Sequence, residues 1–378
     1  MSMEANSQLT NRKVALFVGT RPEIIKVQPI LKELKSRPQI DCLFIHTGQH
    51  YDYNMSSIFI KELNLPEPDL FLNVKSDLPG AQIAKIVTRS EKAIRKLKPT
   101  VVLVEGDTNS TLGAALAAAR MKLPVGHIEA GCRSFNKDMP EEQNRVLVAD
   151  IATHHFTPTE NCSQNLLREG IPRQSIYLTG HPIVDLMESI GKVVDDSTIK
   201  KHGLTLNNYY FVTLHREENV NNAKRLESIL RAIHLISEQN KIIFPIHPHT
   251  KKNVKKYCLT KYLLESKVIE PVGYMESLAM IRNAFAVLTD SGGMQQEAAI
   301  MGTPCLTMRT ETEWVETVKE GLNFVAGYET EKILQTAERI KKDWTLIKNR
   351  LKRTLDLFGK PPVSPKIIDI VETMKGTR

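Results

Sequence analysis

The sequence lacks the glycine patterns that mark the commonest nucleotide cofactor sites. Its 19 glycines never stand two positions apart, so the GxGxxG turn of a dinucleotide site is absent. The GxxxxGK[ST] cradle for ATP phosphates and the GxSxG turn of a hydrolase nucleophile are also missing. These absences argue against a tightly bound nicotinamide cofactor, against ATP use and against acyl-enzyme chemistry.

Cysteine is scarce and shows no metal-binding or disulfide spacing. The five cysteines contain no CxxC pair: Cys42, Cys132, Cys162, Cys258 and Cys305. An odd, scattered set of this kind favours reduced thiols. The histidine groups His154-His155 and His247-Pro248-His249 lack a neighbouring cysteine and the HExxH spacing, so we expect no metal site.

Long apolar runs and a one-sided charge are missing as well. No run approaches the ~20 apolar residues that a membrane helix needs, and the polar N-terminus has no secretory signal pattern. We therefore expect a cytoplasmic protein without a membrane partner. Lys and Arg number 51 against 43 Asp and Glu, but the basic residues are interspersed with acids, and only Lys348–Arg353 forms a cluster. This pattern predicts no nucleic-acid partner and is compatible with an anionic small substrate.

The order of apolar segments predicts an α/β protein built on parallel sheets. In the first half, strands are predicted at Val14–Val18, Cys42–His46, Val101–Val104 and Val125–Ile128, with helices at Glu23–Leu34, Ile58–Leu63, Ala81–Leu97 and Asn109–Met121. After the polar stretch Lys192–Gly203, taken as the domain boundary, strands are predicted at Tyr210–Leu214, Ile242–Ile246, Val268–Ile269, Ala286–Thr289 and Cys305–Thr307, with helices at Arg225–Ser237 and Gln295–Ala299. Two such series predict two Rossmann-like domains facing a cleft, with ligands beyond the carboxyl ends of the strands.

The first predicted strand runs into a glycine turn and then a helix. Gly19 forms the turn, and Arg21 and Lys26 follow on the helix. Backbone N–H groups and the positive end of the helix dipole would make this turn an anion site. The same residues would also suit a simple helix cap at Thr20.

The second half repeats the arrangement. Ser291, Gly292 and Gly293 follow a predicted strand and precede a helix that carries Glu297. The glycines allow close approach of a phosphate, and Glu297 is placed to bind two ribose hydroxyls, although Ser291 could equally be an ordinary helix cap. One such turn in each half favours a phosphate-bearing ligand.

Acidic and basic residues follow the predicted strands. Asp107 and Glu129 come after two strands that are expected to be neighbours, so their carboxylates should lie close together. Crowding pushes the pKa values of such a pair apart and yields one ionised base and one protonated acid. Glu141 and Arg145, four residues apart in PEEQNR, share a helical face, although a surface salt bridge would explain them too. His215, after the first strand of the second half, is a further acid/base or phosphate-binding candidate.

Nine segments together resemble the non-hydrolysing UDP-N-acetylglucosamine 2-epimerases: GTRPEIIK, HTGQH, EGDTNST, HIEAG, MPEEQNR, LHREEN, IHPHTKK, TDSGGMQQEA and TEWVE. The resemblance implies a glycosyltransferase-B-like fold. Its expected parts are an N-terminal domain over residues 1–190 with the acid/base residues, a UDP-binding domain over 191–355, and a C-terminal helix over 356–378 that returns to the first domain. It also implies a homodimer.

The resemblance further implies the reaction, a reversible conversion of UDP-N-acetylglucosamine to UDP-N-acetylmannosamine for surface polysaccharide or glycan synthesis. The family eliminates UDP to leave 2-acetamidoglucal and then adds UDP back, with no cofactor and no metal. The implied catalytic residues are Asp107, Glu129, Glu141, Arg145 and His215. The implied UDP-sugar ligands are Arg21, Lys26, His247, Ser291, Gly292, Gly293 and Glu297.

The chain departs from the family pattern at Trp314, where many members have arginine, and over Phe358–Ile367, where the usual glycine and acidic pattern is missing. The tryptophan form resembles the branch that acts on UDP-2,3-diacetamido-2,3-dideoxyglucuronic acid, which is the alternative substrate. A UDP-sugar glycosyltransferase is a third reading. Some relatives bind a second UDP-sugar as an activator near the segment matching Gln49–Asp52, and the sequence leaves that role open.

Overall fold

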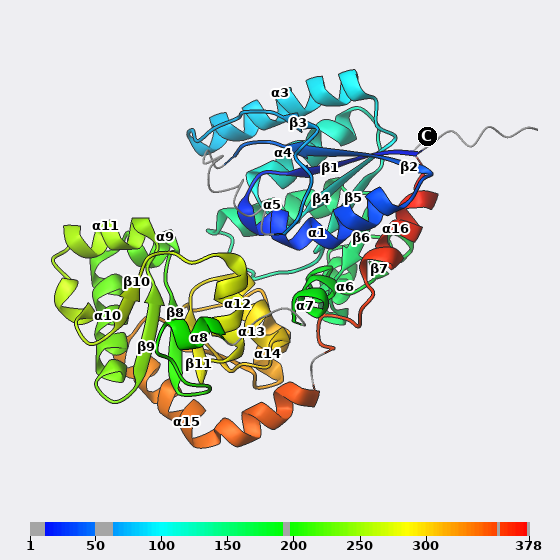
Figure 1. Cartoon of the computed structure of the whole chain (residues 1–378). Helices are drawn as coiled ribbons and strands as arrows, with labels where there is room; N and C mark the ends of the chain where they lie inside the picture. Colours follow the sequence, from blue (N-terminus) through cyan, green and yellow to red (C-terminus); the bar gives the residue numbers. More distant parts are fainter. Residues whose placement is uncertain (1–11, 50–62, 192–196, 354–355, 376–378) are drawn as a thin grey trace, which may run out of the picture. The chain divides into compact units, whose positions relative to one another are not determined.

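The computed structural model describes residues 12–49, 63–191, 197–353 and 356–375 (Figure 1). The chain divides into two compact units: unit 1 comprises Met1–Leu186 and Gly359–Arg378, and unit 2 comprises Met187–Phe358. The division falls inside helix α7 (Ile183–Gly191), ahead of the polar stretch that was expected to mark it. The chain passes from unit 1 to unit 2 within this helix, and its apolar residues Ile183, Leu186 and Met187 are buried.

Unit 1 is built on a parallel sheet with the strand order β3-β2-β1-β4-β5-β6-β7. The strands are β1 (Arg12–Val18), β2 (Ile40–His46), β3 (Leu70–Phe71), β4 (Val101–Glu105), β5 (Val125–Ile128), β6 (His154–Thr157) and β7 (Ile176–Leu178). The strand order reverses between β1 and β4, which is the position where open α/β sheets bind ligands.

Helices cover both faces of this sheet, which explains why its strands read as continuous apolar runs. Val14–Val18 and Val101–Val104 are almost completely buried. The helices of the unit are α1 (Arg21–Ser36), α3 (Pro79–Leu97), α4 (Asn109–Arg120), α5 (Pro140–Ile151), α6 (Glu160–Arg168), the 3-10 turn Arg173–Ser175 and α16 (Ser364–Thr373). Figure 1 shows α1 and α16 on the opposite side of the sheet from α3.

The C-terminal helix α16 packs against α1 within unit 1. Arg37 lies 2.9 Å from Glu372 and 2.7 Å from Asp369. Arg12 donates to the carbonyl oxygens of Val371 and Met374. The last segment of the chain is therefore fixed to the first strand and the first helix.

Unit 2 carries a second parallel sheet with the order β10-β9-β8-β11-β12-β13. The strands are β8 (Tyr209–Thr213), β9 (Lys241–Pro245), β10 (Lys267–Ile269), β11 (Ala286–Thr289), β12 (Cys305–Thr307) and β13 (Asn323–Val325). The helices are α8 (Ser197–Lys201), α9 (Glu217–Val220), α10 (Ala223–Ser237), α11 (Pro248–Lys256), α12 (Tyr274–Arg282), α13 (Gly292–Ile300), α14 (Val315–Lys319) and α15 (Thr330–Arg353), with a 3-10 turn at Thr260–Leu263. Its order reverses between β8 and β11.

The predicted fold class, an α/β protein with two Rossmann-like domains, is confirmed by these two sheets. Every predicted strand is present, and β11 and β12 have the predicted bounds. The sequence prediction missed β3, β6, β7 and β13, each of which has only two to four residues. Of the predicted helix Ile58–Leu63, residues 58–62 lie outside the described residues. Within the described ranges, no helix combines the length and apolar character that a membrane span requires.

Candidate active site

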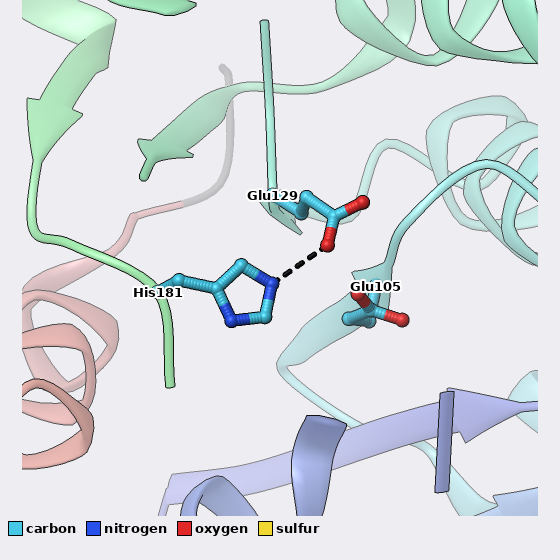
Figure 2. A group of neighbouring side chains, drawn as sticks. All are labelled: Glu105, Glu129 and His181. Atoms are coloured by element: carbon cyan, nitrogen blue, oxygen red, sulfur yellow. Dashed lines mark hydrogen bonds and ion pairs between the residues drawn. The ribbon is translucent and has the colours of Figure 1, made fainter. Parts of the chain in front are cut away.

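Two carboxylates meet Lys26 at the carboxyl ends of β4 and β5, and a histidine contacts one of them. The Lys26 Nζ atom lies 2.5 Å from Glu129 Oε2 and 3.2 Å from Glu105 Oε1. The same Glu129 oxygen lies 2.6 Å from Nε2 of His181, which follows β7 (Figure 2). The carboxylates come from neighbouring strands because β4 and β5 pair in parallel. Lys26, expected as a ligand for phosphate, is thus bound to acidic groups.

Glu129 is held by the backbone as well as by these partners. It has a left-handed conformation with φ 67°, and its side chain is buried. A non-glycine residue in this conformation costs on the order of 1–3 kcal/mol, and such strain is typical of functional sites. The turn directs the Glu129 carboxylate towards Lys26 and His181.

Burial and the shared cation separate the pKa values of these acids. Burial acts to raise the pKa of Glu129, but Lys26 and the hydrogen bond from His181 outweigh it, so this pKa falls below its usual range. Burial raises the pKa of Glu105 well above its usual range, against the attraction of Lys26. Burial also lowers the pKa of His181. Despite burial, the surrounding acids Glu105 and Glu129 raise the pKa of Lys26 well above its usual range, so the cluster is organised around a charged ammonium.

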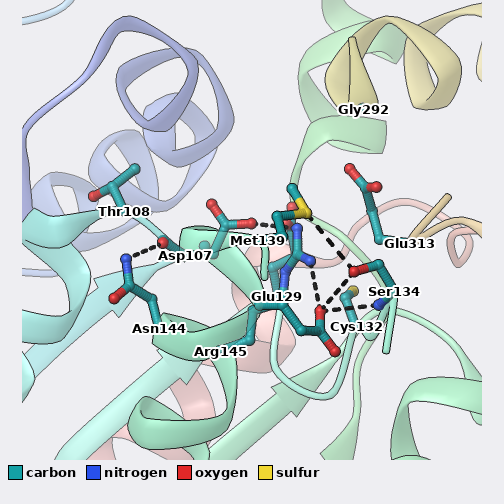
Figure 3. Close-up of polar contacts among 12 residues, drawn as sticks. Asp107, Thr108, Glu129, Cys132, Ser134, Met139, Asn144, Arg145, Gly292 and Glu313 are labelled. Carbon is teal, nitrogen blue, oxygen red and sulfur yellow. Dashed lines mark hydrogen bonds and ion pairs between the residues drawn. The ribbon is translucent and has the colours of Figure 1, made fainter. Parts of the chain in front are cut away.

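Asp107 lies two residues beyond Glu105, the last residue of β4, and its side chain contacts helix α5 (Figure 3). Its Oδ2 atom lies 2.5 Å from Nη2 of Arg145, and its backbone oxygen accepts a hydrogen bond from Asn144 at 2.8 Å. Burial raises the pKa of Asp107, and Arg145 lowers it in part. The expectation that Asp107 and Glu129 occupy neighbouring strand ends is confirmed by the β4–β5 pairing, and their pKa values move in opposite directions.

A glutamate that the sequence analysis did not single out, Glu142, contacts Arg145 along helix α5. Glu142 lies 2.9 Å from Arg145 Nη1, three positions away on the helix, and its side chain is buried. Glu141 is only half-buried and acts on Asp107 electrostatically, where its negative charge raises the pKa. Positions i+3 and i+4 both lie on one helical face, so spacing alone does not distinguish the two glutamates.

The glycine turn before α1 uses two of its backbone N–H groups within the protein. The backbone N–H groups of Gly19 and Thr20 both donate to Oε2 of Glu23, at 3.0 and 2.7 Å. The hydroxyl of Thr108 donates to the other oxygen at 2.9 Å. This is the capping arrangement, one of the two readings that the sequence left open, and it occupies the N–H groups of Gly19 and Thr20. Arg21 lies beside it, partly exposed.

The second glycine turn, in unit 2, remains open at one residue. Ser291 is the N-cap of α13, and its hydroxyl accepts the N–H of Met294. A side chain added to Gly293 would meet no atom within 4 Å, whereas one added to Gly292 would meet Oε1 of Glu313 at 1.9 Å. Glu297 lies on the next turn and is buried. The turn therefore offers space to a ligand at Gly293 and is closed behind Gly292.

A buried carboxylate fixes the histidine segment after β8. Asp290 accepts the backbone N–H groups of His215 and Arg216, at 3.1 and 2.9 Å, and the side-chain amide of Asn219 at 3.2 Å. The exposed rings of His215 and His247 face each other with centroids 6.0 Å apart. Both histidines thus follow the carboxyl ends of strands, β8 for His215 and β9 for His247. Strand β8 pairs with β9 and with β11, the strand that leads into the Ser291 turn.

Trp314 lies behind this turn and does not face solvent. Its indole N–H donates to the backbone oxygen of Gly292 at 2.9 Å, and its ring meets Phe358 edge to face at 5.1 Å. Trp314 is 1% exposed. The residue before it, Glu313, pairs at 3.0 Å with Arg309, which is 2% exposed. The indole of Trp314 therefore supports the glycine turn by a hydrogen bond to the backbone oxygen of Gly292.

One group of side chains has the spacing of a metal site. The ligand atoms of Glu105, Glu129 and His181 all lie within 4.8 Å of one another, and no second group of this kind occurs in the described ranges. The ammonium of Lys26 already contacts both carboxylates, so a divalent cation would have to displace it. The histidines weighed as metal ligands in the sequence are not part of this group.

Sequence reasoning did not assign a role to His181, Glu105 or Glu142. His181 was missed because β7 has only three residues and did not register as a strand. A signal was present, since Gly180-His181-Pro182 follows the apolar Ile176–Leu178.

All five cysteines are free thiols, and the Sγ atoms of Cys132 and Cys162 lie 3.4 Å apart.

The fold and the site together define an enzyme of the nucleotide-sugar type, with an acid/base cluster on one Rossmann-like sheet and an open glycine turn on another. The family model described as UDP-N-acetylglucosamine 2-epimerase matches residues 32–372, and the chain belongs to this family. The family and its members indicate an isomerase.

Several relatives cover nearly the whole chain. It is 44% identical over 344 residues to the UDP-N-acetylglucosamine 2-epimerase of Methanocaldococcus jannaschii, covering 88% of this chain and 94% of the relative. It is 38% identical over 327 residues to the UDP-2,3-diacetamido-2,3-dideoxy-D-glucuronate 2-epimerase of Pseudomonas aeruginosa, covering 86% and 91%.

Solved structures agree with these relatives. The M. jannaschii enzyme in complex with UDP-GlcNAc and UDP matches with a TM-score of 0.87 and 42% identity, covering 96% of this chain and all of that one. The UDP-GlcNAc 2-epimerase of Neisseria meningitidis bound to UDP-GlcNAc matches with a TM-score of 0.84 and 28% identity, covering 96% and 100%.

Proposed function

We propose that this protein interconverts UDP-N-acetylglucosamine and UDP-N-acetylmannosamine, and that it does so for surface polysaccharide or glycan synthesis. The observation that carries the proposal is the pair of neighbouring acids with opposite pKa shifts, Glu129 lowered and Asp107 raised. Such a pair supplies a proton acceptor and a proton donor in one site. The relatives with this activity in M. jannaschii supply the substrate.

The proposed reaction avoids an unstabilised carbanion, because the C2 proton of the sugar is not next to a carbonyl group. An ionised carboxylate takes the C2 proton while the bond between C1 and the diphosphate oxygen breaks, and the electron pair of that bond leaves with UDP. The product of this anti elimination is 2-acetamidoglucal, with a double bond between C1 and C2. UDP then adds back at C1, and an acid delivers a proton to the other face of C2.

Each acid has a role that suits its pKa. Glu129 is ionised and is placed to accept, whereas Asp107, with its raised pKa, is the better donor. Glu141 is a third acid beside Asp107, and Arg145 orients Asp107. Lys26 keeps Glu129 ionised.

In the proposal, unit 2 holds the leaving group. The amino end of α13, with Ser291, Gly292 and Gly293, receives the diphosphate, and Glu297 binds the ribose hydroxyls. His215 and His247 contact the phosphate or the sugar, and Arg21 is a further UDP ligand that supplies positive charge. Fixed positive charge and N–H donors stabilise the charge that develops on UDP as it leaves.

Proton NMR of UDP-N-acetylglucosamine with the purified protein in D2O tests the proposal. Deuterium should enter C2 while the anomeric signal of UDP-N-acetylmannosamine appears. The variants Asp107→Asn and Glu129→Gln should abolish both changes. A spectrum that stays constant, even at high substrate where an activator site would fill, contradicts the proposal.

The second candidate is the same reaction on UDP-2,3-diacetamido-2,3-dideoxyglucuronic acid. Trp314 and the 38% identity to the P. aeruginosa relative favour it. Parallel assays of both nucleotide sugars separate the two, since the true substrate should have the higher kcat/KM. The proposal also includes a cytoplasmic homodimer without cofactor, and light scattering at assay concentration tests the dimer.

A further inference from the structure

Glu142 is a buried carboxylate to which the proposed chemistry gives no task. It lies on α5, and its side chain is 4% exposed. Its Oε1 atom accepts the N–H of Phe135 at 2.9 Å. Its Oε2 atom accepts the N–H of Ser134 at 2.9 Å and the Ser134 hydroxyl at 3.1 Å. A buried carboxylate with this many donors is fixed in place, because each bond offsets part of its desolvation.

The same carboxylate holds one side of the Arg145 guanidinium. Arg145 Nη1 lies 2.9 Å from Glu142, and Nη2 lies 2.5 Å from Asp107. The two terminal nitrogens of the planar fork thus contact two acids, Glu142 outside the reacting pair and Asp107 inside it. A buried guanidinium held at both ends has a fixed orientation, whereas one held at a single end can rotate away.

Glu142 also anchors the segment that follows Glu129. The residue before this segment, Glu129, has a left-handed backbone conformation with φ 67°. Within the segment, Phe135 is left-handed as well, with φ 61°. Phe135 is held there although its ring is 66% exposed, so burial of the ring does not account for its conformation. The hydrogen bonds from the backbone of Ser134 and Phe135 to Glu142 do account for it.

We propose that Glu142 is a positioning residue for the epimerisation, which holds Arg145 against Asp107 and fixes the segment after Glu129. The inference rests on the proposed function. Glu142 does not contact the reacting sugar in this account. It acts through Arg145, which sets the place of Asp107, and through the backbone between Glu129 and α5.

The test compares Glu142→Gln with a matched control. Glu169→Gln perturbs another carboxylate–guanidinium pair in the same unit, a bidentate and partly exposed one, since Glu169 accepts from Arg133 Nε and Nη2 at 2.8 and 2.7 Å. We expect Glu142→Gln to lower kcat by about 10- to 100-fold, because a displacement near 1 Å in a catalytic group costs ~10²-fold. KM should change less than about threefold, since the UDP ligands are untouched. Glu169→Gln should keep wild-type kcat.

A double-mutant cycle separates positioning from general support of the fold. Arg145→Met should itself lower kcat, and adding Glu142→Gln to it should lower kcat by a smaller factor than Glu142→Gln does in the wild type, because the part of the effect that runs through Arg145 is already lost. Melting curves show whether each variant is folded. A wild-type kcat in folded Glu142→Gln, or an undiminished further loss in the Arg145→Met background, overturns the inference. An inactive wild-type protein overturns the proposed function instead.

Discussion

The Nζ atom of Lys26 lies 2.5 Å from Oε2 of Glu129, the oxygen that also accepts from His181 at 2.6 Å. One carboxylate oxygen of the buried Glu129 thus accepts from two donors, the ammonium of Lys26 and the imidazole of His181. The arrangement keeps Glu129 ionised although burial favours its neutral form. Lys26 therefore sets the protonation state of the acid/base cluster.

Lys26→Met should raise the pKa of Glu129, because the main attraction that lowers it is lost while burial remains. The acid side of the kcat profile reports this group, since Glu129 must be ionised to accept a proton. We expect the acid limb, which lies below the accessible range in the wild type, to move upward into the range of about pH 4 to pH 7. At about pH 4, kcat of the variant should fall at least about twofold below its plateau.

Steady-state rates of Lys26→Met measured across pH check this expectation. Lys85→Met is the control, because it removes a lysine that pairs with Asp77 on the surface of the same unit. An acid limb that does not move would mean that Lys26 has no effect on Glu129.

Glu105→Gln tests the opposite pKa shift. Burial raises the pKa of Glu105 well above 4.5, so the folded protein keeps this proton at a pH where the unfolded chain has lost it. Wild-type stability therefore decreases as pH rises above the unfolded pKa, and the neutral amide escapes this decrease. The Tm of Glu105→Gln relative to wild type should increase with pH above about 4.5, by roughly 3 °C per pH unit at most.

Calorimetric melting of both proteins at several pH values provides the comparison. Below the unfolded pKa the difference should become independent of pH, because both chains then carry a neutral side chain at this position. A difference that shrinks as pH rises would show that Glu105 is ionised in the folded protein.

The sequence predicted the parts of the fold and site that depend on local pattern. Long strands such as β1 and β4 were recognised from their β-branched runs, and parallel pairing then placed Asp107 and Glu129 at adjacent strand ends. Strands of two to four residues, such as β7, carry too few residues for a period to register. His181, which follows β7, was lost for that reason.

Other features depend on which side chain fills a site in three dimensions. Gly19 and Thr20 read equally well as an anion site or as a cap, and only the position of Glu23 decides that their N–H groups are occupied. Glu141 and Glu142 both suit a contact with Arg145 by spacing. The packing of α5 turns Glu142 inward, and no local pattern encodes that choice.

Removal of divalent metal should leave the rate unchanged. Glu105, Glu129 and His181 have the spacing of a metal site, but the charged Lys26 stands between the carboxylates. We expect equal initial rates, within error, after dialysis against EDTA and after addition of Mg²⁺ or Zn²⁺. A loss with EDTA that Zn²⁺ restores would mean that a metal displaces the ammonium.

Trp314→Phe should weaken UDP binding with little change in the fold. The phenyl ring retains the edge-to-face packing on Phe358, but it lacks the N–H that donates to Gly292 at 2.9 Å. Gly292 begins α13, so its peptide is part of the turn that presents N–H groups to a diphosphate. A hydrogen bond of this kind contributes about 0.5–1.5 kcal/mol, which corresponds to a roughly 2- to 12-fold increase in the Kd for UDP.

Titration calorimetry with UDP measures this change. Trp344→Phe is the matched control, because its indole also donates to a backbone oxygen of unit 2, that of Phe285 at 3.0 Å, away from α13. Both variants lose one indole N–H, so both should lose similar stability, and only Trp314→Phe should bind UDP more weakly. Equal Kd values for the two variants would show that the Trp314 hydrogen bond supports the fold alone, and that the glycine turn keeps its shape without it.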